Sequence, residues 1–164
     1  ATFQYFVDGI SQTKTITRQI FGKSVPTCAF GFVTDLAAAT NYQDIWWASP
    51  PGSESGWGIN IVHQDDTIFA TWFTYDSDGA PLWLAVSAPL VSHGVYAGAL
   101  YQTTGPAYNA VPFNPAMVMR YPVGSATFTF SDGNDATFAY TLEGTSQAKQ
   151  ITRQVFRAPG TVCA

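Results

Sequence analysis

Residues 57–88 read WGINIVHQDDTIFATWFTYDSDGAPLWLAVSA, and this stretch holds the pattern that decides the fold. Two turn signals, Gln64-Asp65-Asp66 and Asp76-Ser77-Asp78-Gly79, divide it into three runs rich in β-branched and aromatic residues. Apolar and polar residues alternate in the first and third runs, as they do in strands with one buried face. The stretch therefore predicts three consecutive antiparallel strands, over residues 57–63, 67–75 and 81–88.

Similar turn signals continue to the C-terminus and predict five more strands, over residues 95–103, 116–121, 125–131, 135–142 and 147–156. Short strands joined by short turns are typical of an antiparallel meander. We expect an all-β, up-and-down eight-stranded barrel, with a β-sandwich as the alternative. Residues 34–40 (TDLAAAT) indicate a short helical turn, with Thr34 or Asp35 as its cap.

Period-two alternation assigns the side chains of each strand to two faces. Trp57, Ile59 and Ile61 share one face, and Asn60 lies on the other. The strand over residues 67–75 differs because both of its faces are apolar, with Ile68, Ala70 and Trp72 opposite Phe69, Phe73 and Tyr75. A strand with one wet face would not look like this, so its outer face is either covered or a contact surface.

The start of the chain is repeated near its end. Ala1–Phe21 matches Ala136–Phe156 at 13 of 21 positions, at an offset of 135 residues. Each copy reads as a strand, a turn and a second strand. We interpret residues 30–164 as a complete β-barrel module and residues 1–29 as a hairpin repeat of residues 136–164. The hairpin is the tail of a preceding module, part of one enlarged sheet, or an element swapped between chains.

The two cysteines, Cys28 and Cys163, are also related by this offset. Neither lies in a CxxC pair or at the spacing of a zinc site. The repeat favours a disulfide that ties the two ends of the module over two unrelated buried thiols. Little lysine and many Thr, Ser, Gly and aromatic residues favour a secreted or periplasmic protein over a cytosolic one.

Composition excludes several classes of protein. Charged residues make up 11% and aromatic residues 15%, unlike a disordered chain or a coiled coil. Seven basic residues against eleven acidic ones argue against a nucleic-acid partner, and a membrane span would need a longer apolar run. The partners that we expect are a small-molecule or glycan ligand and a homodimer by hairpin exchange, or tandem modules in a longer parent chain.

Catalytic and metal-binding patterns are weak. His63 and His93 stand beside turns and not in the setting of an activated nucleophile. Asp76-x-Asp78-Gly79 resembles a fragment of a calcium loop, but turn chemistry explains it better. We therefore expect no catalytic residues, no metal and no cofactor.

All five tryptophans lie within residues 46–83, which makes this stretch the candidate binding region. A tryptophan ring suits a sugar ring or a small apolar ligand, but it can also fill a barrel core. Arg153 stands between Ile151 and Val155, as a buried anchor or as a surface residue. The candidate ligand-binding residues are Trp46, Trp47, Trp57, Asn60, Trp72, Tyr75, Trp83 and Arg153.

Five motifs carry a resemblance to a known family: DIWW (44–47), SGWGIN (55–60), FATWFTYD (69–76), GAPLWL (79–84) and ITRQ (151–154). The set resembles a β-repeat of secreted proteobacterial proteins, a family usually without an assigned function. The resemblance implies a secreted β module, in tandem or appended to an exported enzyme, and it carries no catalytic residues. A weaker resemblance, of architecture alone, is to calycin-type barrels such as lipocalins and avidins, in which a basic residue closes over a tryptophan. Trp57 and Arg153 are the residues expected in those parts.

The leading hypothesis is a non-catalytic binding module of a secreted bacterial protein, which recognises a carbohydrate or a small apolar ligand through a Trp-rich surface or pocket. The alternative is a structural or protein-contact module, for tandem assembly, adhesion or inhibition, that uses the extra hairpin.

Overall fold

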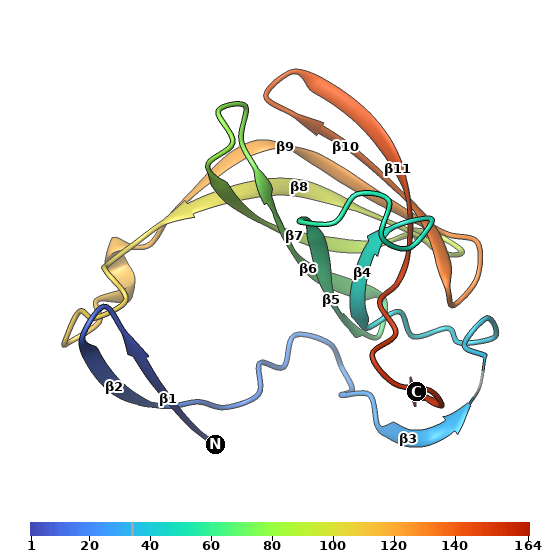
Figure 1. Cartoon of the computed structure of the whole chain (residues 1–164), viewed down its shortest axis with the longest axis horizontal. Helices are drawn as coiled ribbons and strands as arrows, with labels where there is room; N and C mark the ends of the chain where they lie inside the picture. Colours follow the sequence, from blue (N-terminus) through green and yellow to red (C-terminus); the bar gives the residue numbers. More distant parts are fainter. Residues whose placement is uncertain (34) are drawn as a thin grey trace.

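A computed structural model describes residues 1–33 and 35–164, and it is built around a closed antiparallel barrel (Figure 1). Each strand pairs with the next along the chain, and the last pairs with the first. This confirms the predicted up-and-down eight-stranded barrel. Its strands are β4 (Asp44–Ala48), β5 (Gly58–Gln64), β6 (Thr67–Tyr75), β7 (Pro81–Ser92), β8 (Val95–Thr104), β9 (Met119–Phe130), β10 (Asp135–Leu142) and β11 (Thr145–Arg153).

Two smaller sheets lie outside the barrel. β1 (Thr2–Val7) and β2 (Ile10–Thr15) form the N-terminal hairpin, and β3 (Cys28–Val33) pairs with β12 (Gly160–Cys163). β8 and β9 extend beyond the barrel as an arm, and the hairpin lies beside the end of this arm (Figure 1). The arm carries η1 (Pro115–Met117). None of the described residues forms a helix long and apolar enough to cross a bilayer.

Most predicted strands are confirmed, and two of them match to the residue, 67–75 and 135–142. The prediction of separate strands over residues 116–121 and 125–131 was wrong, because β9 runs through both. Leu100 pairs with Gly124 and Tyr101 with Pro122, so that Val123 is an extra residue in a bulge. A bulge accommodates a proline, which has no N–H to donate, without ending the strand.

Strand β4 was not predicted from the sequence. It has only five residues, Asp44–Ala48, and its central three are all apolar, so they show no alternation. The strand forms because β11 and β5 flank it, and both partners are far away in the sequence or beyond a loop. The barrel still has the predicted eight strands, because β4 adds one strand and the two predicted strands that merge into β9 count as one.

The predicted turn near residues 34–40 is a single turn and not a helix. The Ala39 N–H donates to the Leu36 carbonyl at 2.8 Å, and the Asp35 carboxylate accepts from the Ala37 N–H at 2.9 Å. Asp35 therefore caps the turn, while the alternative cap, Thr34, lies outside the described residues.

The barrel lumen is filled with apolar side chains, and the predicted faces are confirmed. Ile59, Ile61, Trp72 and Leu84 point inward and are buried, whereas their strand neighbours face outward. Burial of this much apolar surface is the main contribution to the stability of the fold. The largest fully buried side chains are Trp46, Phe128, Phe138, Ile59, Ile68, Leu100, Ile151 and Val86.

The predicted disulfide between Cys28 and Cys163 is formed, and it links β3 to β12. Residues 16–27, here called the strap, run from the N-terminal hairpin along the barrel to β3 (Figure 1). Gln64 fastens the strap to β5, because its Oε1 accepts from the N–H groups of Phe21 and Gly22 at 2.9 and 3.0 Å. The strap is thus tied to the barrel at both the disulfide and Gln64.

The double substitution C28S/C163S should lower the free energy of unfolding by about 4–5 kcal/mol, because the disulfide closes a loop of 135 residues. The barrel strands should remain folded, since the bond joins a sheet outside the barrel. Urea denaturation followed by tryptophan emission measures the change. A loss below about 1 kcal/mol would show that the unfolded chain gains little freedom.

Candidate functional site

The structure separates the eight candidate binding residues into two sets of four. Trp46, Trp72 and Arg153 are buried inside the barrel, and Trp57 is half-buried at the edge of its core. Strand alternation places the other four on the outside of β4–β7, and they are Trp47, Asn60, Tyr75 and Trp83. The candidates therefore do not form one site, and the two sets have different surroundings.

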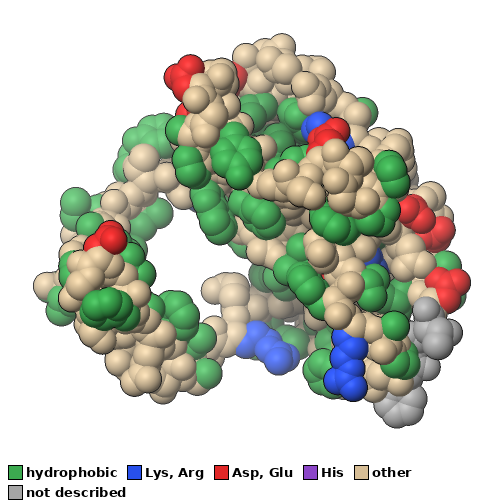
Figure 2. Space-filling view, in the orientation of Figure 1, with side chains coloured by type: hydrophobic (Ala, Val, Ile, Leu, Met, Phe, Trp, Pro, Cys, Tyr) green, Lys and Arg blue, Asp and Glu red, His purple; other side chains and the backbone are tan. Residues whose placement is uncertain are grey.

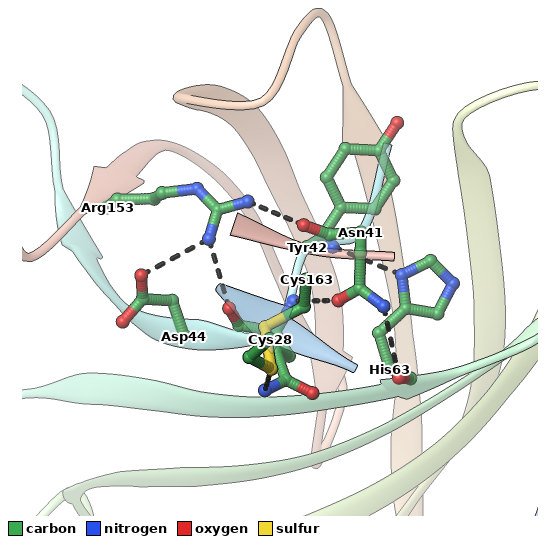
Figure 3. Close-up of a disulfide and its surroundings, with 8 residues drawn as sticks. Cys28, Asn41, Tyr42, Asp44, His63, Arg153 and Cys163 are labelled. Carbon is green, nitrogen blue, oxygen red and sulfur yellow. Dashed lines mark hydrogen bonds and ion pairs between the residues drawn. A yellow bond between two sulfur atoms is a disulfide. The ribbon is translucent and has the colours of Figure 1, made fainter. Parts of the chain in front are cut away.

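Arg153 joins β11 to Asp44 of β4 and to the residues just before it, and so helps to close the ring of strands (Figure 3). Its guanidinium donates to the carbonyls of Asn41 at 2.8 Å and Gln43 at 3.0 Å, and also to the carbonyl of Gly133. It pairs with the Asp44 carboxylate at 3.2 Å. Burial lowers the pKa of Arg153, and Asp44 opposes this effect. The prediction of a buried anchor is confirmed, because these contacts satisfy a charge that would be costly alone.

The aromatic partner of Arg153 is Trp46 and not Trp57. The guanidinium carbon lies 5.1 Å from the centre of the Trp46 ring. Trp57 instead lies under Lys149, whose ammonium is 5.4 Å from the ring centre, and its Nε1 donates to Glu54 at 2.9 Å. The expectation for Trp57 was wrong because Trp46 belongs to β4, the unpredicted strand that pairs with β11.

His63 is a neutral histidine that contacts Tyr42, the residue after the Asn41 carbonyl that Arg153 binds. The Tyr42 N–H donates to Nδ1 of His63 at 3.1 Å, so Nε2 carries the proton and faces the Tyr96 hydroxyl at 3.1 Å. Burial lowers the pKa of His63 and raises the pKa of Tyr96 to about 12. Tyr42 and Tyr96 were not predicted as part of this cluster, because single aromatic residues in a loop and a strand carry no motif.

The outer face of β4–β7 carries aromatic rings. Gly58, Phe73 and Trp83 are cross-strand neighbours, and the Phe73 and Trp83 ring centres lie 5.8 Å apart. A Cβ at Gly58 would lie 2.7 Å from Phe73 Cζ, so the glycine leaves room for this ring. Trp83 is 64% exposed, and Tyr75 on the same face is exposed as well. We call Trp47, Phe73, Tyr75 and Trp83 the aromatic platform.

Polar side chains follow next to the platform on the same outer face. Asn60 pairs with Thr71, two residues along the strands from the Gly58–Phe73 pair and so on the same face. Asn60 and Thr71 line a groove of about 1060 Å³ between the barrel and the strap. Phe21 of the strap and Phe69 of β6 form one wall with their ring centres 6.4 Å apart, and Arg18 lines the groove. The platform, the polar row and the groove make one continuous surface.

Among the residues that the structure describes, the buried indole nitrogens of Trp47 and Trp72 have no hydrogen-bond partner. Trp47 belongs to the platform, whereas Trp72 lies inside the barrel against Tyr140, with ring centres 4.5 Å apart. A buried donor without a partner costs free energy. The stability of the fold therefore does not by itself explain why these two positions carry tryptophan.

Metal-binding geometry is not found among the residues that the structure describes, where no three His, Cys, Asp or Glu side chains gather. Asp76 takes part in turn chemistry, because its Oδ1 accepts from the N–H groups of Asp78 and Ala80 at 2.9 and 2.8 Å. Those contacts give one oxygen of the Asp76 carboxylate a role in the turn, as expected for turn chemistry.

Comparison of the chain with protein-family models, with curated proteins and with solved structures found no match.

Arg153→Ala should lower the free energy of unfolding by about 3–5 kcal/mol, because Asp44 and three backbone carbonyls lose their partner. Arg18 is the repeat equivalent of Arg153 and is exposed, so Arg18→Ala is the matched control and should change stability by less than about 0.5 kcal/mol. Urea denaturation measures both. Equal losses for the two variants would contradict the closing role of Arg153.

The stability of the protein should depend on pH through His63. The pKa of His63 is lowered in the folded state, so the unfolded chain takes up a proton first as the pH falls below about 6.5. The free energy of unfolding should then fall with decreasing pH, by at most about 1.4 kcal/mol per unit. His63→Gln should flatten this profile between pH 7 and 5, whereas His93→Gln, in an exposed turn, should keep its slope.

Proposed function

We propose that this chain is a non-catalytic binding module that recognises a carbohydrate on the aromatic platform. The single observation that carries the proposal is the exposure of Trp83, 64%, on a strand beside the ring of Phe73. Exposed large rings on a β-surface cost solvation free energy without adding to the core. A sugar ring that stacks on them would remove that cost.

The outside of the barrel suits a ligand better than its lumen. Trp46, Phe128, Phe138 and Ile59 fill the lumen and have almost no exposed surface. A ligand inside would have to displace this packing, which has the density of a protein interior. The outer face needs no such rearrangement, because the rings of Tyr75 and Trp83 already face solvent.

Polar groups beside the platform support a carbohydrate over a purely apolar ligand. The exposed Asn60 and the half-buried Thr71 are neighbours on β5 and β6 and offer an amide and a hydroxyl. Sites for sugars combine an apolar ring surface with a few hydrogen-bonding groups that set orientation. The groove that they line together with Arg18 and Phe21 gives room for a second or third sugar unit of the same glycan.

Trp83→Ala should weaken glycan binding about tenfold, because it removes the most exposed ring of the platform. Intrinsic tryptophan emission of the wild type, titrated with cellohexaose, xylohexaose, chitohexaose and mannohexaose, identifies the ligand. The affinities of W83A and F73A for that ligand are then measured by calorimetry.

Tyr121→Ala is the control, because Tyr121 is an exposed aromatic on β9, outside the platform. It should bind as the wild type does. The proposal fails if no sugar in the panel changes the emission and calorimetry also detects no heat of binding. It fails as well if Y121A and W83A lose affinity equally.

A further inference from the structure

The N-terminal hairpin and the last hairpin of the barrel share their structure as well as their sequence. Tyr5 pairs with Gln12 in the first, and Tyr140 pairs with Gln147 in the second. In both hairpins the tyrosine hydroxyl donates to the glutamine side chain. The turn residues also agree, since Asp8 and Glu143 have φ values of 48° and 49°, each before a glycine. The β1–β2 hairpin therefore has the same register as β10–β11.

The two hairpins differ in what covers them. Phe138 and Ile151 point into the barrel and are 0% exposed. Their equivalents Phe3 and Ile16 are 51% and 48% exposed. The N-terminal hairpin thus carries the residues that the barrel hairpin buries, but its own copies are exposed. A free two-stranded hairpin is at best marginally stable in water.

The second strand of the hairpin is cut short for the same reason. β11 continues to Arg153 because residues 151–153 pair with β4. β2 ends at Thr15, and the equivalent residues 16–18 are not in a strand. Arg18 is exposed, whereas Arg153 is buried. In the part of the chain that the structure describes, the hairpin has neither a neighbour like β4 on one edge nor a neighbour like β9 on the other.

The contacts that hold the hairpin in its present position are mainly with the arm and not with the barrel core. The Tyr5 hydroxyl oxygen lies 2.8 Å from the Tyr108 carbonyl oxygen, and Gln12 Nε2 donates to the Asn109 carbonyl at 2.9 Å. These contacts hold the turn half of the hairpin to the arm. Open space separates the hairpin from the barrel (Figure 2).

We propose that the β1–β2 hairpin is a barrel-completing element that docks in the β10–β11 place of a second copy of this barrel. There Phe3 would lie among the core residues that contact Phe138, and Arg18 would reach the residues of β4 that Arg153 contacts. The occupant is a barrel of the same repeat, because the residues kept on the hairpin are those that this barrel buries.

A capture experiment with the full chain tests this proposal. The acceptor is the double variant F3A/F138D, in which a carboxylate in the core dislodges β10–β11 and the weakened β1–β2 cannot replace it. It is co-expressed with a differently tagged donor that is wild type, F3A or F6A. Phe6 is 73% exposed and lies on the other face of β1, so F6A is the matched control.

Wild-type and F6A donors should each capture the acceptor as a one-to-one complex, and the F3A donor should capture at least tenfold less. Light scattering gives the stoichiometry, and tryptophan emission reports whether the acceptor barrel is folded. A second acceptor, F3A/I151D, should behave in the same way because Ile151 is equally buried on β11.

Capture that does not depend on Phe3, or an acceptor that stays insoluble with the wild-type donor, would overturn the proposal. The single variant F138D separates exchange between copies from exchange within one chain. A folded dimer supports the second copy as occupant. A folded monomer that Phe3→Ala unfolds would show that the hairpin fills its own barrel, and this would overturn the choice of occupant.

Discussion

The seam between β11 and β4 is the constraint on which the rest of the barrel depends. It has only three residue pairs, Ile151–Ala48, Thr152–Trp47 and Arg153–Trp46, whereas β6 and β7 share nine. The guanidinium of Arg153 compensates for the short ladder, because it joins β11 to carbonyls before β4 and to Gly133. A charge that is buried in this way is specific, since no apolar residue could bind three carbonyls in that geometry.

Alternation along the strands explains why tryptophans that are close in sequence lie in different surroundings. Trp46 and Trp47 are neighbours, yet one is buried under Arg153 and the other lies on the outer face. The same holds for Trp72 and Phe73 on β6. A Trp-rich stretch of strands therefore supplies a barrel core and an external ring surface at once, which gives one segment both stability and the platform.

The sequence predicts what depends on local pattern and on the repeat. Strand 67–75, the division of its side chains between two faces and the Cys28–Cys163 bond all follow from alternation, turns or the offset. Strand β4 and the bulge near Pro122 do not, because each depends on partners distant in sequence. For the same reason the sequence could not tell that Arg153 lies over Trp46. The exposure of Trp83 also needed the structure, since alternation gives two faces without saying which one is covered.

The two hairpins form a natural experiment on context. Thirteen of 21 residues are identical, the turns match and the register matches, so local sequence determines the hairpin itself. It does not determine burial, because Phe3 is exposed where Phe138 is buried. Nor does it determine strand length, because within residues 1–33 and 35–164 no strand like β4 pairs with Ile16 to Arg18. Burial and full strand length therefore depend on the closed ring of eight strands. The last residues of β11, which include Arg153, are in a strand because β4 pairs with them there.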